Sequence, residues 1–473
     1  MFFSSLTPRW RLTLEAAGIF ALTALALGWV VFPLEGFLGP DTYYHFRLSE
    51  RMAAEGPFIG VTSLPLTILG TYGPDHHLLW HVLLMPFTCG ADAFSGMQWA
   101  AVITGAMVPA GLFIFMRSVQ IPWPWFFALI AVVGVSLMPG RLVMLRAQNI
   151  AVLLIAASLW AIMKKRPRTL GVIAFVFMGT YHGAVILAPI TLIYALVVGL
   201  TDRRFAWRPA TFALAGGLLG LIINPFFPAS FEYLFFHTIY TVPEAGLATG
   251  GGTEWSAPSL TTILRDGWAV HALLLTALGY VAWRRAWAKL TTETRFALAF
   301  AGLTLWMYAG SLRFAEYYSP FGVVAAGLVF RDMRGEITLK RALKMGVVAL
   351  LMGGIVLQTA VGFGVIKRHS EFLPAKYAEI AAAIDRDRPG ELVFNTAYHD
   401  FPFLYFHRPD LTYVIGLDPH YLSYTHDGLA KNWTWIGAVK AEEPNDPAPL
   451  IRQAFKSRWA VVDRHKPGLH TRL

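Results

Sequence analysis

The sequence has little charge and almost no cysteine. Only 14% of its 473 residues are charged, whereas 56% are hydrophobic, and its mean hydropathy is +0.51. Because a soluble globular domain carries about 25% charged residues, this scarcity of charge excludes an ordinary soluble protein. The single cysteine, Cys89, excludes an intramolecular disulfide and any cysteine-rich metal site.

Acidic residues are also scarcer than basic ones, with 29 Asp and Glu against 39 Lys and Arg. A net charge of +10 is compatible with nucleic-acid binding, but the basic residues form short clusters between apolar runs. Clusters in such places set the orientation of a membrane protein, so we expect no nucleic-acid partner. No A-x-A-like cleavage site follows the early "RWR", and we expect the first apolar run to be kept as a signal anchor.

Long apolar runs are what the sequence has in abundance. Segments such as "AGIFALTALALGWVVFPL" approach the length of about 20 residues that crosses a bilayer. We therefore predict a polytopic α-helical membrane protein with about 11 transmembrane helices. The predicted spans are residues 13–34, 96–116, 122–139, 149–163, 169–181, 183–200, 209–227, 260–283, 295–311, 314–330 and 342–364.

The basic clusters predict an orientation for these spans. If the N-terminus is cytoplasmic, alternate loops place the clusters on the cytoplasmic side, as the positive-inside rule requires. These clusters are Arg117, "KKRPR" from Lys164, "DRRFAWR" from Asp202, "RRAWAK" from Arg284 and "RDMRGEITLKRALK" from Arg331. We therefore expect an integral protein of the plasma (inner) membrane, with its acidic and histidine-rich loops on the outer, periplasmic or extracellular, face.

A change of composition divides the chain. We predict a transmembrane domain over residues 1–366 and a small external α/β domain over residues 367–473, whose strands are "ELVFN", "TYVIG" and "WAVVD". The segment that starts at His76, "HHLLWHVLLMPFTCGA", is short and polar at its start. We expect it to form a helix at the outer interface.

Three stretches on the predicted outer face carry candidate functional residues. "DTYYHFRLSERMAAEG" has helical spacing and predicts an interfacial helix capped by Asp41. Capping and contact with lipid head groups are the simplest roles for this stretch. However, an acid beside an apolar span is costly unless it is paired or functional. Glu244 in "TVPEAG" is either a turn residue or a functional acid. Arg313, Glu316 and Tyr317 are spaced for a local Arg–Glu pair or for an arginine that binds phosphate.

Five motifs in order, "DTYYHFRL", "PGRLVMLRAQNIA", "YHGA", "TVPE" and "RFAEYY", resemble those of the catalytic subunit of the N-oligosaccharyltransferases. That family belongs to the GT-C superfamily of polyprenyl-phosphate-dependent glycosyltransferases. The resemblance covers most of residues 10–335, and "AYHDFPF" lies where the family carries its Trp-Trp-Asp-Tyr-Gly signature. It implies a GT-C-like fold and glycosyl transfer from a lipid-linked sugar.

The resemblance also implies roles for single residues. Asp41 matches the acid that helps to hold a divalent cation and orients the acceptor, and Glu244 matches the glutamate of a mobile loop that closes over the acceptor. Arg313 and Tyr317 match the residues that engage the lipid-linked pyrophosphate, and His182 takes the place of a Trp-Gly-Gly turn. The remaining candidate substrate-binding residues are Tyr44, His45 and Arg47 of the first motif, and His399 and Asp400 of the signature.

The chain departs from the family at two motifs. Arg146 and Gln148 replace an acidic pair, which removes hard oxygen ligands for Mg²⁺ or Mn²⁺ and adds a positive charge. This replacement favours a metal-free site in which Arg146 stabilises phosphate charge instead. The two signature tryptophans are replaced by Tyr398 and His399. This replacement favours an acceptor other than a standard N-glycosylation sequon.

We therefore expect an inverting membrane glycosyltransferase. Its donor would be a polyprenyl-phosphate or -diphosphate sugar that enters from the membrane lipid, and its acceptor a glycan, a lipid or a protein. Asp41 would act as base or acceptor-orienting group, and Glu244 would gate access. The alternatives are a non-catalytic carrier of lipid-linked glycans and an inactive partner subunit, which hydropathy alone does not exclude.

Overall fold

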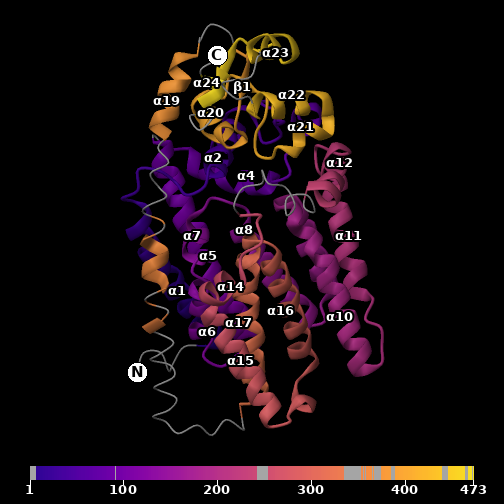
Figure 1. Cartoon of the computed structure of the whole chain (residues 1–473). Coiled ribbons are helices and arrows are strands. Elements are labelled where there is room, and N and C mark those ends of the chain that lie inside the picture. Colours follow the sequence, from indigo (N-terminus) through magenta and orange to yellow (C-terminus); the bar gives the residue numbers. More distant parts are fainter. Residues whose placement is uncertain are drawn as a thin grey trace. The chain divides into compact units, whose positions relative to one another are not determined.

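The computed structural model describes the whole chain except residues 1–6, 91, 242–253, 335–352, 355, 357, 365, 367–373, 385–388, 439–445, 464–466 and 471. The chain forms two compact units, each of which is assembled from three separate stretches of sequence. The first unit contains residues 1–34, 98–220 and 245–369, and the second contains residues 35–97, 221–244 and 370–473. The fold is predominantly helical (Figure 1).

The first unit is a bundle of apolar helices. Its helix α17 is deeply buried: every residue from Ala315 to Val329 is buried, and the helix packs against α6, α15 and α16. The elements of this unit are α1 (Pro8–Val31), α5 (Ala93–Ser118, which begins in the second unit), α6 (Pro124–Val133), α7 (Met138–Val143), α8 (Gln148–Met163), α9 (Pro167–Thr180), η3 (His182–Ile186), α10 (Leu187–Asp202), α11 (Arg208–Ile222, which ends in the second unit), α14 (Leu260–Asp266), α15 (Trp268–Trp283), η5 (Trp287–Lys289), α16 (Thr292–Gly310), η6 (Leu312–Phe314) and α17 (Ala315–Asp332).

Each span predicted before residue 331 contains a helix, and three of these helices are long and apolar enough to cross a membrane. Those three are Arg9–Val31, Ala93–Ser118 and His182–Asp202. The last predicted span, residues 342–364, lies largely outside the described residues. The total of about 11 spans therefore stays a prediction.

Two of the predicted spans are interrupted rather than continuous. Residues 122–139 divide into α6 and α7, and residues 260–283 divide into α14 and α15. The two interruptions meet, because the Ser136 N–H donates a hydrogen bond of 3.0 Å to the Asp266 carbonyl. Backbone groups that a helix end leaves unpaired need such partners in an apolar environment, so each interruption supplies what the other lacks.

The second unit combines short helices with a small parallel sheet. The sheet has the strand order β2-β1-β3, and Val393 of β1 pairs with both Tyr413 and Trp459. Its elements are α2 (Asp41–Glu55), α3 (Ile68–Tyr72), α4 (Leu78–Leu84), η2 (Met85–Thr88), α12 (Ala229–Phe236), η4 (His237–Thr241), α19 (Pro374–Ala383), β1 (Leu392–Asn395), η7 (Tyr398–Asp400), α20 (Phe401–His407), β2 (Thr412–Tyr413), α21 (His420–Thr425), α22 (Asp427–Ala438), α23 (Pro447–Ala454), β3 (Trp459–Val461) and α24 (Pro467–His470).

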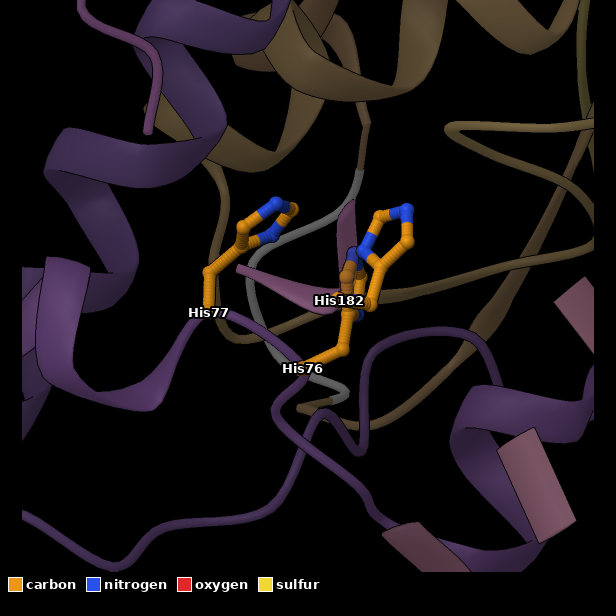
Figure 2. Close-up of side chains that lie close together, drawn as sticks. All are labelled: His76, His77 and His182. Atoms are coloured by element: carbon orange, nitrogen blue, oxygen red, sulfur yellow. The ribbon is translucent and has the colours of Figure 1, made fainter. Parts of the chain in front are cut away.

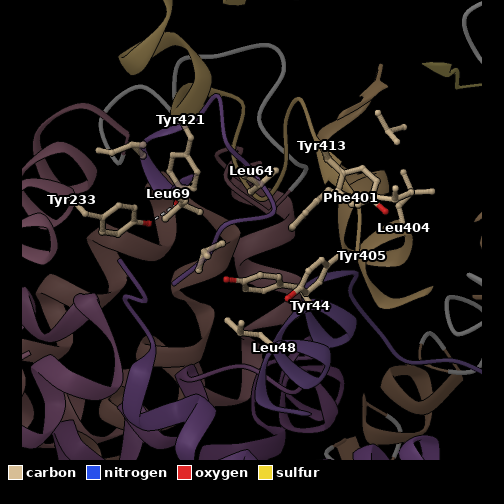
Figure 3. Packing of buried hydrophobic residues seen from close by; sticks show 14 of the residues in the cluster. Tyr44, Leu48, Leu64, Leu69, Tyr233, Phe401, Leu404, Tyr405, Tyr413 and Tyr421 are labelled. Atoms are coloured by element: carbon tan, nitrogen blue, oxygen red, sulfur yellow. Dashed lines mark hydrogen bonds between the residues drawn. The ribbon is translucent and has the colours of Figure 1, made fainter. Parts of the chain in front are cut away.

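One hydrophobic core joins the three stretches of the second unit (Figure 3). The first stretch contributes Tyr44 and Leu48 of α2, the second contributes Tyr233 of α12, and the third contributes Phe401 and Tyr405 of α20. Strands occur in all three segments where the sequence predicted them. Because residues 35–97 and 221–244 share this core, a separate external domain over residues 367–473 stays a prediction.

The helix predicted in the first loop is α2, but the predicted cap is wrong. Pro40 occupies the N-cap position and no side chain caps the helix, whereas Asp41 is the first helical residue. A carboxylate in the first turn still interacts favourably with the positive end of the helix dipole. The helix expected from His76 onward is present as α4 and η2, and its position at a membrane interface stays a prediction.

Candidate functional site

A chain of alternating charges lies at the start of α8 in the first unit. The Glu254 carboxylate bridges two arginines, with one oxygen 2.9 Å from Arg141 Nη1 and the other 2.9 Å from Arg146 Nη1. Arg141 also contacts Glu316 at 3.4 Å. We call Arg141, Arg146, Glu254, Arg313 and Glu316 the arginine cluster. It contains three arginines and two carboxyl groups.

The backbone of the segment around Glu254 is fixed by the turn that connects α16 to α17. The Arg313 N–H and the Ser311 hydroxyl both donate to the Glu254 carbonyl, at 3.0 and 2.9 Å. The Arg313 guanidinium lies 4.7 Å from the centre of the Trp255 ring, in a cation–π contact. Among the described residues, no carboxylate is within ion-pair distance of that guanidinium, so Arg313 does not form the local pair with Glu316 that its spacing allowed.

Burial strengthens the electrostatic interactions within this cluster. The side chains of Arg141 and Arg146 are 8% exposed, and that of Glu254 is 27% exposed. Burial alone would raise the pKa of the Glu254 carboxyl, but the charges of Arg146 and Arg141 outweigh it and hold this pKa well below its usual range. Glu254 is therefore ionised at neutral pH, and the cluster keeps a net positive charge that suits a phosphate group.

Other residues singled out from the sequence lie around the same cluster. Tyr317 hydrogen-bonds with Tyr181, and Gln148 Nε2 donates to the Tyr181 hydroxyl at 3.5 Å. Tyr181 is followed by His182, whose ring centre is 4.6 Å from that of Tyr181. Thus four predicted residues, Arg146, His182, Arg313 and Tyr317, belong to one connected region of the first unit.

The residues at this position do not fit a divalent cation. Mg²⁺ and Mn²⁺ prefer carboxylate, carbonyl and water oxygens, but the carboxylates that lie here, Glu254 and Glu316, are bound by guanidinium groups. The Gln148 amide faces Tyr181. The guanidinium groups of Arg141 and Arg146 supply the positive charge at this position.

A chain of buried hydrogen bonds lies in the second unit. The Asp75 carboxylate accepts from His81 Nδ1 at 2.7 Å, and His81 Nε2 lies 2.8 Å from His45 Nδ1. Asp75 and His81 are 1% and 0% exposed and His45 is 6% exposed. Burial alone would raise the pKa of the Asp75 carboxyl, but the neighbouring His81 more than offsets this effect and lowers it. This Asp75–His81–His45 chain fixes the orientation of His45 on α2.

Two more histidines belong to the turn before α4, and Figure 2 shows the side chains of His76 and His77. Their ring centres are 4.0 Å apart, and the His76 ring stacks on Tyr233 of α12 at 4.5 Å. Burial lowers the pKa of His76 to about 3, so its imidazole is neutral at physiological pH. The third histidine drawn there, His182, belongs to the first unit.

The remaining predicted residues of the first loop have structural contacts. Tyr44 is 1% exposed and packs in the core of the second unit (Figure 3). Arg47 donates through Nε to the Phe406 carbonyl at 2.7 Å and forms an ion pair with Glu50. These contacts connect α2 to α20. A role of Tyr44 or Arg47 in substrate binding stays a prediction.

The predicted signature residues connect two helices. Asp400 is 5% exposed and accepts a hydrogen bond of 2.6 Å from the Tyr377 hydroxyl, which joins α20 to α19. His399 is half-exposed, and its Nε2 lies 3.9 Å from the Asp400 carboxylate. Glu244 lies outside the described residues. Its predicted role on a closing loop therefore stays a prediction.

Sequence reasoning missed Arg141, Glu254, Asp75 and His81. Arg141 stood in the quoted motif "PGRLVMLRAQNIA", and its signal was that two arginines share one short turn between apolar runs. Glu254 lies ten residues after Glu244 in the same long loop, and only the folded structure shows that it binds two arginines. Asp75 and His81 had no signal beyond the local density of histidine.

Comparison with known proteins finds similar structures but no similar sequence. No family model and no curated protein matches the sequence. ArnT from Cupriavidus metallidurans bound to undecaprenyl phosphate matches the structure with a TM-score of 0.57 and 16% identity, over 95% of this chain and 96% of that one. The same protein in its apo state matches with a TM-score of 0.50 and 15% identity, over 87% and 88%.

A second kind of solved structure has a similar fold. The apo oligosaccharyltransferase of Archaeoglobus fulgidus matches with a TM-score of 0.56 and 12% identity, over 85% of this chain but only 64% of that one. The chain therefore spans less than two thirds of the length of that enzyme. Both neighbours are GT-C glycosyltransferases, and the chain has the GT-C fold that its five ordered motifs implied.

Proposed function

We propose that the protein is a membrane glycosyltransferase that uses a polyprenyl-phosphate-linked sugar as donor. The observation that carries this proposal is the arginine cluster within a GT-C fold, because its net positive charge suits a lipid-linked phosphate. A neighbour with the same fold, matched over nearly its whole length, is bound to undecaprenyl phosphate. We infer that the corresponding product of this protein is a free polyprenyl phosphate.

Arg313 and Arg146 are proposed to hold the phosphate. The Arg313 guanidinium stacks on Trp255, which orients it and leaves its N–H groups for an anion. Arg146 already binds one anionic oxygen, that of Glu254, and could bind a phosphate oxygen in the same way. Both cations would stabilise the charge that grows on the phosphate as the sugar leaves, which is the role that a metal ion has in related enzymes.

Asp41 is proposed to act as the base. A hydroxyl oxygen of the acceptor would attack the anomeric carbon of the sugar, and the bond between that carbon and the phosphate oxygen would break. The acceptor proton would pass to the Asp41 carboxylate, while the phosphate would leave with both electrons of the broken bond. A phosphate needs no general acid to leave, so a single carboxylate suffices. Inversion at the anomeric carbon follows from one direct displacement.

The acceptor is proposed to be a hydroxyl of a glycan, a lipid or a protein, rather than the amide of an N-glycosylation sequon. An amide nitrogen needs strong activation before it can attack the sugar. The two motifs that differ in this chain are the ones proposed to supply this activation in the resembled family. The reaction is proposed to occur on the outer, periplasmic or extracellular, face of the plasma membrane. The distribution of basic clusters along the sequence supports this orientation.

The test is a transfer assay with the full chain in lipid nanodiscs. Lipid extract from the native host supplies the donor, and release of polyprenyl phosphate is measured with and without a chelator. We expect turnover by the wild type that the chelator does not change. Asp41→Ala should abolish turnover while donor binding is kept, and Arg313→Gln should weaken donor binding by about tenfold or more.

Matched variants separate these effects from loss of charge alone. Glu35→Ala removes an exposed acid six residues before Asp41, and Arg265→Gln removes an exposed arginine of the first unit; both should behave like the wild type. Donor binding that depends on Arg313 without any turnover would instead support a non-catalytic carrier or an inactive partner subunit. Transfer to an Asn-X-Thr peptide would overturn the proposed acceptor class.

A further inference from the structure

A pocket of about 300 Å³ lies at the ends of several helices of the first unit. It is formed where α8 ends and α9 begins, and by the segment between α10 and α11. Its lining is Ala161, Ile162, Lys165, Arg166, Pro167, Leu170, Tyr194, Phe205, Ala206, Trp207, Arg208 and Pro209. This lining combines three cations with a mostly apolar wall.

The cations of this pocket are not neutralised by neighbouring acids. Among the described residues, no carboxylate lies within ion-pair distance of Lys165, Arg166 or Arg208. Arg166 contacts the Trp160 ring at 5.4 Å, which orients its guanidinium but leaves its charge. The two connecting segments, residues 164–168 and 202–208, contain only one acid, Asp202. The pocket therefore attracts an anion.

The surroundings of the pocket are apolar and exposed. Phe205 and Trp207, which line it, are 68% and 55% exposed, and tryptophan side chains gather where a membrane meets water. Leu200 near the end of α10 is 85% exposed, and Leu214 on the second turn of α11 is 63% exposed. An occupant of this pocket meets cations at one end and hydrocarbon at the other.

We propose that this pocket binds the head group of an anionic glycerophospholipid. Its phosphate would lie among Lys165, Arg166 and Arg208, and its acyl chains would follow the exposed apolar faces of α10 and α11. Basic pockets between membrane helices recognise anionic head groups in this way. Orientation in the membrane explains why basic residues occur here, but it does not require three of them to line one cavity.

This pocket is distinct from the proposed donor site. Arg146 lies just before the first turn of α8, whereas Lys165 and Arg166 follow its last turn. A helix of 16 residues is roughly 24 Å long, so one phosphate cannot contact both places. The inference does not depend on the proposed transferase activity.

The test compares two triple variants of the full-length protein in detergent by native mass spectrometry. The first is Lys165→Gln/Arg166→Gln/Arg208→Gln. The matched control is Lys164→Gln/Arg168→Gln/Arg204→Gln, which removes the same charge from the same two segments but changes no residue of the pocket. The probes are phosphatidylglycerol, phosphatidylcholine with identical acyl chains, and inorganic phosphate.

We expect the wild type to bind phosphatidylglycerol in preference to phosphatidylcholine. At about fivefold for each cation, the pocket variant should lose about 100-fold in affinity, whereas the control should lose less than about tenfold. Equal losses in both variants would overturn the pocket, because a diffuse positive surface would then explain the binding. If phosphatidylcholine bound equally well, the proposed preference for an anionic head group would be wrong. If inorganic phosphate competed fully, the proposal that the ligand is a lipid would be wrong.

Discussion

The two units use buried polar groups in opposite ways. In the first unit, permanent charges are paired: Arg141, Arg146 and Glu254 are all ionised, and their attraction joins the segment around α7 to the segment before α14. In the second unit, the Asp75 carboxylate is hydrogen-bonded to the His81 ring, which contacts the His45 ring. The neighbouring His76 ring is neutral at physiological pH. The first arrangement therefore depends little on pH between about 5 and 9, whereas the second changes with it.

The largest change in stability is expected from removal of the Glu254 carboxylate, which binds both Arg141 and Arg146. Glu254→Ala leaves Arg141 and Arg146 buried with less neutralising charge and should destabilise the protein by about 3 kcal/mol, since breaking a buried ion pair leaves an uncompensated charge. The melting temperature in detergent measures this change. Pyrophosphate, added as a replacement anion, should raise the melting temperature of the variant more than that of the wild type. An unchanged melting temperature would show that the bridge contributes nothing to stability.

The second unit contains a histidine that should make the protein less stable in acid. Its His76 has a pKa of about 3 when folded and 6.5 when unfolded, so the unfolded state binds the proton first as the pH falls. The contribution of His76 is thus complete above pH 6.5 and is lost as the pH falls toward 3. Between pH 6.5 and about pH 4.5 the loss should be about 2 kcal/mol.

A variant isolates this contribution. His76→Phe keeps a flat ring for stacking on Tyr233 but cannot bind a proton. The fall of the melting temperature between pH 6.5 and about pH 4.5 should be smaller in this variant than in the wild type. Identical acid profiles would show that His76 is not the group responsible.

A smaller effect is expected from the Asp75–His81–His45 chain. His81→Gln removes a fully buried ring that contacts Asp75 and His45 and should destabilise the protein by about 1–2 kcal/mol, because the buried carboxylate loses a partner. A double-mutant cycle with Asp75→Asn measures the coupling directly. If the two single effects add without coupling, the contact between Asp75 and His81 makes no contribution of its own.

The smallest effect concerns a neutral hydrogen-bonded pair in the core of the second unit. The hydroxyls of Tyr233 and Tyr421 are 2.6 Å apart in its core (Figure 3). Tyr233→Phe keeps the ring and should cost about 1 kcal/mol, which is typical of one buried hydrogen bond. Tyr421→Phe should cost about the same, and the double variant should cost less than the sum, because both single changes remove the same bond. Chemical unfolding of the three variants checks this.

Much of the helical fold could be predicted because apolar runs of bilayer length leave few alternatives. Helices such as α5 and α8 lie where the hydropathy placed them. The interruptions between α6 and α7 and between α14 and α15 were missed, because the hydrogen bond that makes them tolerable joins Ser136 to Asp266, far apart in the sequence. The cap at Asp41 was wrong because Pro40 takes the N-cap position.

The candidate site could be predicted only in part. Arg313 stood out because its spacing from Glu316 suited an ion pair or a phosphate, and Arg146 because it stands where the resembled family has an acid. The structure connects both to Glu254. Their carboxylate partner could not be chosen from the sequence, since Glu244 and Glu254 share one loop and only tertiary contacts distinguish them. The same holds for His45, whose partner His81 comes from a different helix.

The interleaved make-up of the second unit imposes an order on the maturation of the nascent chain. Its core needs Tyr44 and Leu48 together with Phe401 and Tyr405, but translation reaches residue 370 on the order of 15–55 s after residue 97, at about 5–20 residues per second. During that interval the first stretch has apolar side chains without their final partners. A ribosome that stalls before residue 370 would therefore leave a chain in which the first unit has most of its helices while the second has no sheet.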